Sequence, residues 1–400
     1  MQISKAFVWI VYRTLTVFAV LPLATTANAQ LDLSTSLIGN APASIQDLER
    51  QAFEILFGIN PSDDVELAMR LLMEAAEAGS AVAADRLSFA YGTGEGVPMD
   101  LAEAFRLQRQ AAQAGSASAQ LRVGLQYLSG AEVDADPIEA RKWLEAAAAQ
   151  GDARALFALA GTYLEATYAE TDMDLLLPPL ARAAELGEPA ALRQLGTLLL
   201  RDQERLDPER GLHALEQAAA TFPELATTIG LNYLAGRVVE RDLERAVRWL
   251  SEGEAAGNLG AKVWIAELHE RGLGLAQDLE LAEEIRGEIL RSASARDKNT
   301  IAWDLSINAD PFLRNGELAV RLMESLLDSP EIQYPAMLDT LAAAYAEAGR
   351  FDDAIATQQR AIDLLDAPSG ETAEAQPDPG GYRERLALYR TGQPYRRASQ

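Results

Sequence analysis

The sequence has 400 residues, enough for two or three globular domains or for one elongated array of repeats. Its formal net charge of −25 argues against nucleic acid or an anionic membrane as the main partner, because both attract basic surfaces. Apolar residues make up 48% of the chain but aromatic residues only 6%, a balance that favours close helix packing over β-sheet. The chain has no cysteine, which excludes disulfides, thiolate metal sites and a cysteine nucleophile.

Residues 1–29 are predicted to form a secretory signal peptide. Lys5 and Arg13 are followed by a short apolar run, LTVFAVLPL, and by the small-x-small string ANA. A retained membrane anchor is the alternative, but the apolar run is shorter than the ~20 residues that span a bilayer. We therefore expect cleavage between Ala29 and Gln30 and an exported, periplasmic protein with no transmembrane segment after cleavage.

Strings of the form A-A-x-x-G recur along most of the chain. They are AAEAG, AAQAG, AAAQG, AAELG, the degenerate AAATF and GEAAG, ending at Gly79, Gly115, Gly151, Gly187, Phe222 and Gly257. The steps of 35 or 36 residues are typical of stacked helical hairpins, each too small to bury its own apolar face.

Three further columns keep the same register. A ring column consists of Tyr91, Tyr127, Tyr163, Leu199, Tyr233 and His269. A small-residue column three positions earlier consists of Ser88, Gly124, Ala160, Gly196, Gly230 and Ala266. An apolar column one position before that consists of Leu87, Val123, Leu159, Leu195, Ile229 and Ile265. Spacings of three and four place the columns on one face of a first helix, where the small residues let the partner helix approach.

The start of each second helix also has a recurring residue. The predicted N-caps are Asp64, Asp100, Asp136, Asp172, Asp242 and Asp278, with Asp207 displaced by one position. An aspartate there accepts hydrogen bonds from the free N–H groups of the first helical turn. Further along this helix Trp143 and Trp249 share a column with aliphatic residues, which indicates packing between helices.

The glycine-rich string YGTGEGV lies between two such helices. Glycines recur three residues after the ring column, at Gly94, Gly130, Gly236 and Gly272. Helices commonly end on a left-handed glycine. A phosphate-binding loop would instead need a preceding strand and, in its commonest form, a Lys-Ser/Thr pair. The glycines are therefore predicted to form turns.

The combined pattern L-G/A-x-x-Y-x-x-G-x-G-V-x-x-D-x-x-x-A-x-x-W-x-x-x-A-A-x-x-G resembles the Sel1-like repeat, a relative of the tetratricopeptide repeat. It covers residues 80–293 in six units after a degenerate unit at 44–79, so the predicted Sel1-like solenoid spans 44–293. The unit that begins at Pro189 lacks the tyrosine and both turn glycines. PAMLDTLAAAYAEAGRFDDAIATQQRAIDLL, residues 335–365, resembles a tetratricopeptide repeat, and residues 294–366 are predicted to form such repeats.

The resemblance implies an all-α, right-handed superhelical solenoid of antiparallel helix pairs. Residues 30–43 are expected to be a flexible N-terminal segment, and residues 367–381, rich in turn formers, a linker. Residues 382–400 carry five Arg against one Glu. Two alternatives remain open for them: a short helix that caps the array, or a basic tail that docks on acidic surface.

No enzyme signature stands out, so we expect no catalytic, metal-binding or cofactor-binding residues. His269 lies in the ring column and is interpreted as a packing residue. His213 follows Gly211, which is interpreted as a turn glycine, and has no histidine or cysteine partner nearby. Acidic pairs are too frequent to separate a glycosidase-like pair from solvated helix surface.

The resemblance implies a non-enzymatic scaffold or adaptor for protein–protein interaction in the bacterial cell envelope. Two alternatives are a cell-wall-type hydrolase and a carbohydrate-binding component of envelope polysaccharide export. A groove lined by aromatic and polar side chains would indicate the carbohydrate-binding component. The protein partner and the oligomeric state are left open.

Tetratricopeptide-like geometry predicts which first-helix residues face the concave side and contact a partner. They are Phe157, Glu165, Arg193, Thr197, Arg201, Leu231, Glu267 and Arg271. Arg193 and Arg201 lie eight residues apart, about two helical turns, on a very acidic chain. They are expected to form a local positive site for an acidic segment of the partner.

Overall fold

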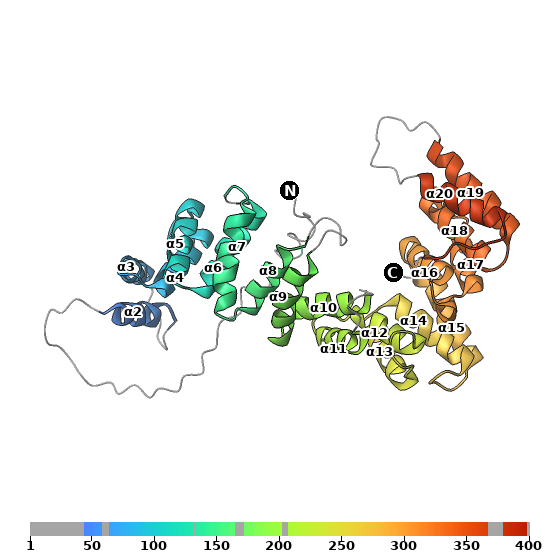
Figure 1. Ribbon diagram of the computed structural model, residues 1–400, viewed down its shortest axis with the longest axis horizontal. Helices are drawn as coiled ribbons and strands as arrows, with labels where there is room; N and C mark the ends of the chain where they lie inside the picture. Colours follow the sequence, from blue (N-terminus) through green and yellow to red (C-terminus); the bar gives the residue numbers. More distant parts are fainter. Residues whose placement is uncertain are drawn as a thin grey trace. The chain divides into compact units, whose positions relative to one another are not determined.

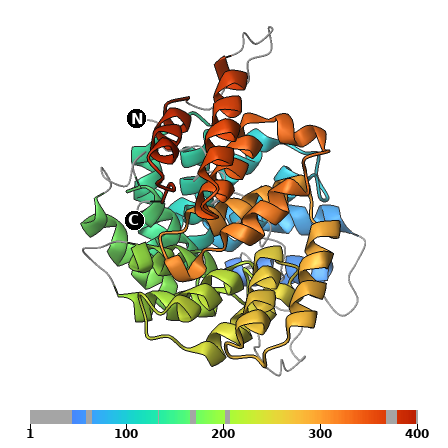
Figure 2. The ribbon, with the colours of Figure 1, turned by 90° about the vertical axis from the view of Figure 1, so that its right-hand side faces the viewer.

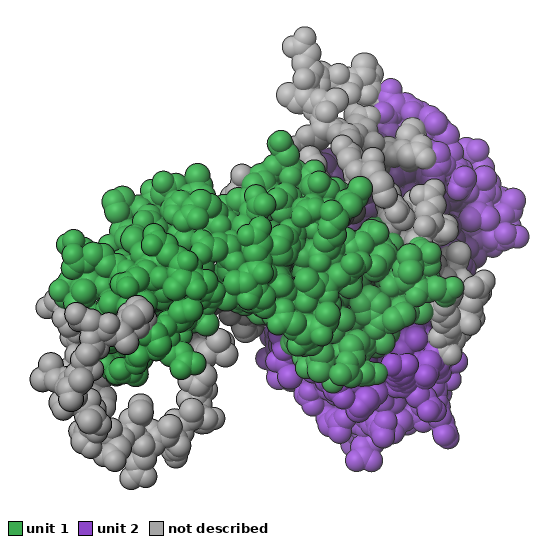
Figure 3. Space-filling model, turned by 60° about the vertical axis from the view of Figure 1, so that its left-hand side comes forward, with its two compact units in different colours: residues 1–195 green, residues 196–400 purple. Residues whose placement is uncertain are grey.

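The computed structural model describes residues 44–57, 64–131, 133–164, 172–201, 207–366 and 379–397. Within these ranges every regular element is a helix (Figure 1). The chain divides into two compact units, residues 1–195 and 196–400, which are described separately (Figure 3). The predicted signal peptide, the segment 30–43 and most of the predicted linker lie outside the described residues.

The first unit is a run of antiparallel helical hairpins in which each helix from α2 to α9 packs against the next. The helices are α2 (Ile45–Phe57), α3 (Val65–Glu77), α4 (Ala81–Thr93), α5 (Leu101–Gln113), α6 (Ala117–Ser129), α7 (Pro137–Ala149), α8 (Ala153–Gly161), α9 (Met173–Glu185) and the first part of α10 (Pro189–Arg201). Leu72, Leu87 and Val123 are among the buried residues of one continuous core that extends from α2 to α6.

The second unit continues the same architecture. Its helices are the end of α10, α11 (Pro208–Ala218), α12 (Leu225–Ala235), α13 (Leu243–Ala255), α14 (Leu259–Arg271), α15 (Leu279–Ser292), α16 (Ala295–Ile307), α17 (Gly316–Glu324), α18 (Pro335–Glu347), α19 (Phe351–Asp366) and α20 (Pro379–Arg390), with 3₁₀ turns η2 (Pro311–Leu313) and η3 (Pro330–Gln333). One core extends from Leu212 to Tyr389. α18, α19 and α20 lie side by side in this unit (Figure 2). Consecutive packed hairpins are the architecture of a helical solenoid, as predicted.

The aspartate N-caps are confirmed in all seven hairpins. Asp100 shows the pattern: its Oδ1 accepts from the backbone N–H groups of Ala102 and Glu103, both at 3.0 Å. Asp136 and Asp172 also accept two such bonds, and one backbone N–H is accepted by each of Asp64, Asp207, Asp242 and Asp278. Each first helical turn therefore has a side-chain acceptor for its otherwise unpaired donors.

The backbone of the capping aspartate closes the turn on the ring column. The N–H of Asp100 donates to the carbonyl of Tyr91 at 2.9 Å, and the N–H of Asp278 donates to the carbonyl of His269 at 3.0 Å. Asp136 and Asp242 make the same bond to Tyr127 and Tyr233. At these four positions the ring column holds the turn through its main chain, with a tyrosine or a histidine side chain alike.

The turn glycines end the first helices in the left-handed conformation, as predicted. Gly94, Gly130, Gly236 and Gly272 are the C-caps of α4, α6, α12 and α14, with φ of 78°, 66°, 67° and 65°. An L side chain is strained at these angles. The glycine-rich string at 91–97 is therefore a helix ending.

The small-residue column lies where two helices of a hairpin touch. A Cβ atom on Gly124 would lie 2.8 Å from the Leu144 side chain, and one on Gly196 would lie 2.7 Å from the carbonyl oxygen of Gly211. The interpretation of Gly211 as a turn glycine is wrong: it lies inside α11, where it lets α10 and α11 approach.

Candidate partner-binding site

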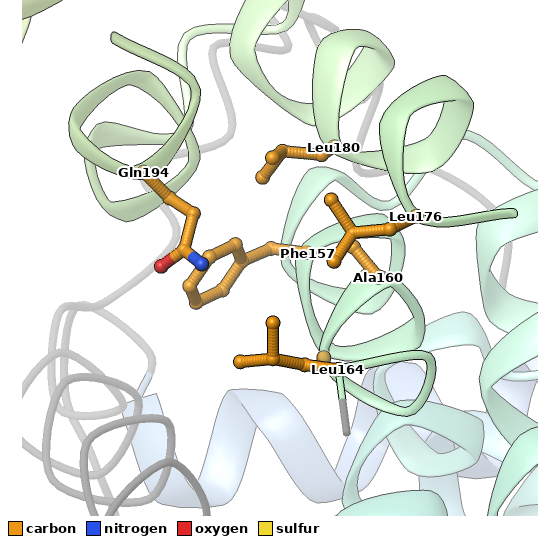
Figure 4. Close-up of a pocket in the computed structure, with 7 residues that line it drawn as sticks. Phe157, Ala160, Leu164, Leu176, Leu180 and Gln194 are labelled. Atoms are coloured by element: carbon orange, nitrogen blue, oxygen red, sulfur yellow. The ribbon is translucent and has the colours of Figure 1, made fainter. Parts of the chain in front are cut away.

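Phe157, the first of the predicted groove residues, points into the interior of the first unit. Its side chain is 2% exposed and lies between α8 and α9, with Leu176 and Leu180 on one side and Gln194 of α10 on the other (Figure 4). The cavity among these residues has a volume of about 10 Å³, the space of about one water molecule. Phe157 therefore packs the hairpin and presents no surface to a macromolecule.

The structure places the α10 residues only in part. Arg193 and Thr197 are half-buried on α10, where both take part in interactions with other residues. The side chain of Arg201 and the whole of Glu165 lie outside the described residues. The positive site expected from Arg193 and Arg201 stays a prediction.

In the second unit Glu267 lies at the centre of a buried ionic cluster. It is 1% exposed, pairs with Arg286 of α15, and receives Nη2 of Arg271 at 3.0 Å and the Asn315 amide at 2.9 Å. Burial acts to lower the pKa of Arg286, but hydrogen bonds to Glu270 and Glu267 outweigh it and raise that pKa. Glu267 thus holds α14, α15 and the start of α17 together from the inside.

Arg271 and Leu231 are the predicted positions that lie nearer the surface. The Arg271 guanidinium lies over the Phe312 ring at 5.2 Å, and Arg241 lies over the same ring at 4.5 Å. Two cations held against one aromatic ring form a rigid feature, because each guanidinium is attracted to the ring's electrons. Leu231 is half-buried and packs against the core of the unit.

Beside Arg241 a polar groove of about 840 Å³ lies between α11, α13 and the turn that joins α12 to α13; we call it the α11–α13 groove. It is lined by Glu209, His213, Glu216, Tyr233, Val239, Glu240, Arg241, Asp242, Leu243, Arg245 and Arg248. Its volume is within the range of pockets that hold drug-sized ligands or a few peptide residues. Charges of both signs line its walls.

Hydrogen bonds fix the central charges of this groove. The Arg245 Nη1 donates to the Tyr233 hydroxyl at 3.0 Å, and that hydroxyl donates to Glu216 Oε1 at 3.0 Å. Burial raises the pKa of Tyr233, and the bond to Glu216 raises it further, so the phenol stays protonated and donates to the carboxylate. Arg248 lies over the neighbouring Trp249 ring at 5.4 Å. The groove therefore presents preset donors and acceptors.

The first unit has a smaller, more apolar hollow of about 200 Å³ between α2, α3 and α4. Phe57 and Phe89 at its rim are 58% and 45% exposed, and the Arg86 guanidinium lies over both rings, at 4.4 Å and 5.6 Å.

Each histidine lies within hydrogen-bond distance of a polar group close by in the chain. His269 Nδ1 lies 3.1 Å from the Ala276 carbonyl, and His213 Nε2 lies 2.9 Å from the Gln217 amide. The described residues contain no group of three or more side chains suited to a metal ion. None of the described helices has the length and apolar character needed to cross a bilayer.

The α11–α13 groove was not predicted from the sequence. Its walls come mainly from the second helices of two consecutive hairpins, whereas tetratricopeptide-like geometry predicts partner contacts on the first helices. The only signal was Tyr233 in the ring column, followed after a turn by three arginines at Arg241, Arg245 and Arg248.

The hairpins with left-handed turn glycines match a known repeat. The Sel1 repeat model matches residues 81–116, 117–152, 225–258 and 253–284. A Sel1 repeat protein from Oxalobacter formigenes is similar in structure, with 22% identity, a TM-score of 0.52, and coverage of 85% of this chain and 96% of that chain. A protective antigen from uropathogenic Escherichia coli strains, which displays an SLR fold, is 20% identical, with a TM-score of 0.49 and coverage of 80% and 78%. No curated protein matches the sequence.

Each matched range contains the left-handed turn glycine and the aspartate cap of one hairpin. Proteins built from such stacked hairpins generally act as scaffolds for protein–protein interaction, because the stack offers an extended binding surface. The chain therefore contains Sel1 repeats within residues 81–152 and 225–284, and its described hairpins have the fold of a Sel1-like repeat solenoid.

Proposed function

We propose that this protein is a non-enzymatic scaffold of the bacterial cell envelope that binds a polar segment of a protein partner in the α11–α13 groove. The observation that supports the proposal is the groove itself, about 840 Å³ in volume and lined by charges of both signs. Preset charges favour a partner with the complementary pattern and exclude others, which is how charged interfaces achieve specificity. Export to the periplasm, from the sequence pattern of residues 1–29, is part of the proposal.

A polypeptide suits the groove better than a sugar. Carbohydrate binding would use an aromatic face, and the groove has one aromatic side chain in its lining, Tyr233. Its ring is covered by the Arg245 guanidinium at 5.2 Å and its hydroxyl already bonds Glu216. The exposed groups that remain are the His213 imidazole and a larger number of guanidinium and carboxylate groups, which pair with the side chains and termini of polypeptides.

The test places a photo-crosslinking amino acid at His213, whose side chain is 69% exposed on the wall of the groove. The protein is produced in its own cell envelope, irradiated and purified, and crosslinked species are identified by mass spectrometry. We expect one or a few discrete protein adducts. The double variant Arg245→Glu/Arg248→Glu should lose them, because it reverses two of the groove's three arginine charges.

Arg70→Glu is the matched control, since Arg70 is an exposed arginine of α3 in the other unit. It should keep the adducts. Adducts that persist in the groove variant, or that the control loses to the same degree, would refute the groove as the binding site. Hydrolysis of a cell-wall substrate by the purified protein would refute the non-enzymatic assignment.

A further inference from the structure

Residues 394–397, which follow α20 without regular secondary structure, lie against α16 and α18. α20 ends on its own cap, in which Gly392 has φ of 69° and the N–H of Gln393 donates to the Leu388 carbonyl at 3.0 Å. Such a left-handed ending satisfies the last carbonyls of a helix without help from the residues beyond it. Residues 394–397, which we call the tail, are therefore not needed to end α20.

α20 is also anchored independently of the tail. Tyr382, Leu386 and Tyr389 are buried against the core of the unit. Arg385 pairs with the buried Asp339 of α18 at 2.7 Å. The tail can leave its position while α20 stays in place.

The tail completes the end of α16. The backbone N–H of Arg397 donates to the Ile307 carbonyl at 2.9 Å, and Nη1 of Arg396 lies 3.4 Å from the Ser306 carbonyl. These are among the last carbonyls of a helix, which have no partner within it and form the negative end of its dipole. An extended segment with a free N–H and a positive side chain is the complementary ligand for such an end.

Each of the tail residues Tyr395, Arg396 and Arg397 contacts an aromatic or acidic side chain near the end of α16. Arg397 Nη2 lies 3.0 Å from Asp304 Oδ1, and Arg396 pairs with Glu347 of α18. The Tyr395 ring lies 6.2 Å from the Trp303 ring, centroid to centroid. The face formed by Trp303, Asp304, the carbonyls of Ser306 and Ile307, and Glu347 is called the α16–α18 face below.

The contacts are of a kind that exchanges readily. The side chains of Arg397 and Asp304 are 52% and 54% exposed, and ion pairs this exposed are weak and screened by salt. Glu347, whose side chain is 13% exposed, retains Arg314 Nε at 2.9 Å when the tail departs. Departure of the tail thus leaves no buried charge without a partner.

We propose that the α16–α18 face binds an extended segment of another protein in which an aromatic residue is followed by two basic residues. The chain's own tail, Tyr395-Arg396-Arg397, occupies the face until such a segment displaces it. This inference rests on the proposed scaffold function and adds to it a second, self-occupied site. A tethered tail has a millimolar effective concentration, so it excludes weak ligands and selects for strong ones.

The test compares the full chain with its Arg396→Glu/Arg397→Glu variant, in which the tail is repelled from Asp304 and Glu347. The probe is a fluorescein-labelled peptide, GQPYRRASQ, and its control is GQPYEEASQ; binding is followed by fluorescence anisotropy at low salt. The opened variant should bind the first peptide at least tenfold more tightly than the full chain does, and should not bind the control. In the opened background Asp304→Asn should weaken binding severalfold, whereas Asp328→Asn, at an exposed aspartate beyond α17, should not.

A random peptide library displayed on phage is then selected on the opened variant. Enrichment of aromatic–basic–basic segments supports the site. Equal binding by the full chain and the opened variant, no binding by either, or a library that enriches no such segment would each overturn it. Crosslinking from His213 reports on the α11–α13 groove and does not use this face, so a failure here is distinct from a failure of the scaffold function.

Discussion

The α12/α13 hairpin and the α8/α9 hairpin show two ways to make the same repeat. α12/α13 has a left-handed glycine, Gly236, and an aspartate cap, and it matches the Sel1 repeat model. α8/α9 lies between the matched stretches, lacks the turn glycine, has a first helix of nine residues, and carries Pro178 and Pro179 inside its second helix. Yet its apolar and small columns, Leu159 and Ala160, are buried as in the other hairpins. The turn glycine is part of the sequence pattern by which a repeat is recognised, whereas burial of the apolar and small-residue columns stabilises the hairpin with or without that glycine.

The largest loss of stability is expected from a substitution at Gly196 of the α10/α11 hairpin, which has no turn glycine and whose helices are held together by packing. Its Cβ would lie 2.7 Å from a backbone oxygen, which yields less readily than the Leu144 side chain that faces Gly124. Gly196→Leu should lower the free energy of unfolding by about 3 kcal/mol and Gly124→Leu by about 1–2 kcal/mol, the two ends of the usual range for overpacking. Urea denaturation of both variants measures the difference. An equal or reversed order would contradict this ranking of backbone against side chain.

Gly272 tests the contribution of the turn itself. Gly272→Ala should cost about 1–2 kcal/mol of stability, because alanine is strained in the left-handed conformation. Gly287→Ala is the matched control in the same hairpin, since Gly287 lies inside α15 and a Cβ there meets the end of a flexible arginine. The control should be neutral or stabilise by about 0.5–1 kcal/mol. Thermal melts of the two variants that shift in the same direction would contradict the role of the turn.

The aspartate caps are common to the matched and unmatched hairpins and should therefore contribute equally. Asp136 and Asp172 each accept two backbone N–H bonds, from 3.0 to 3.3 Å. Replacement of either by Ala should lower the free energy of unfolding by about 1 kcal/mol. Hydrogen exchange at the first turns of α7 and α9 would localise the effect. A loss confined to the matched hairpin would show that the cap depends on the glycine turn.

The smallest change in stability is expected from substitution of Glu283, a residue of α15 that pairs with Arg321 of α17. Hydrogen bonds from Arg321 are the main reason that the pKa of Glu283 falls from 4.5 to about 2. A lowered pKa in the folded protein means stabilisation that is complete above pH 4.5 and is lost as the pH falls toward 2. The side chain is 54% exposed, so the effect should be small. Glu283→Gln should flatten the dependence of the urea midpoint between pH 5 and pH 2.5, and an unchanged slope would contradict it.

What sequence predicted well is what repeats along the chain. The caps, the turn glycines and the buried columns recur at fixed spacing, so several copies of the same residue type support each assignment. Gly211 was misread because it occurs in one unit without such copies. The chain's 35- or 36-residue period could not reveal that Glu267 meets Asn315 or that Arg397 meets Asp304, since those pairs join different helical hairpins and occur once.

The same limit applies to the candidate sites. Counting positions from the ring column located Arg271 near the surface but also selected Phe157 and Glu267, which are buried. Helical geometry fixes the direction of a side chain only to within a sector, and the neighbouring hairpin decides whether that sector is open or filled. The α11–α13 groove depends on two hairpins at once, so no spacing within one repeat could indicate it.

The hydrogen bond that joins four of the capping aspartates, Asp100, Asp136, Asp242 and Asp278, to the ring column has a consequence for how these repeats diversify. The acceptor is a main-chain carbonyl, which every amino acid possesses, so His269 closes its turn as Tyr91 does. A position whose structural task is carried by the backbone leaves its side chain open to mutation and selection. Tyr233, which organises the charges of the groove, shows one outcome of that freedom. New specificity can thus arise at the ring column without rebuilding the repeat beneath it.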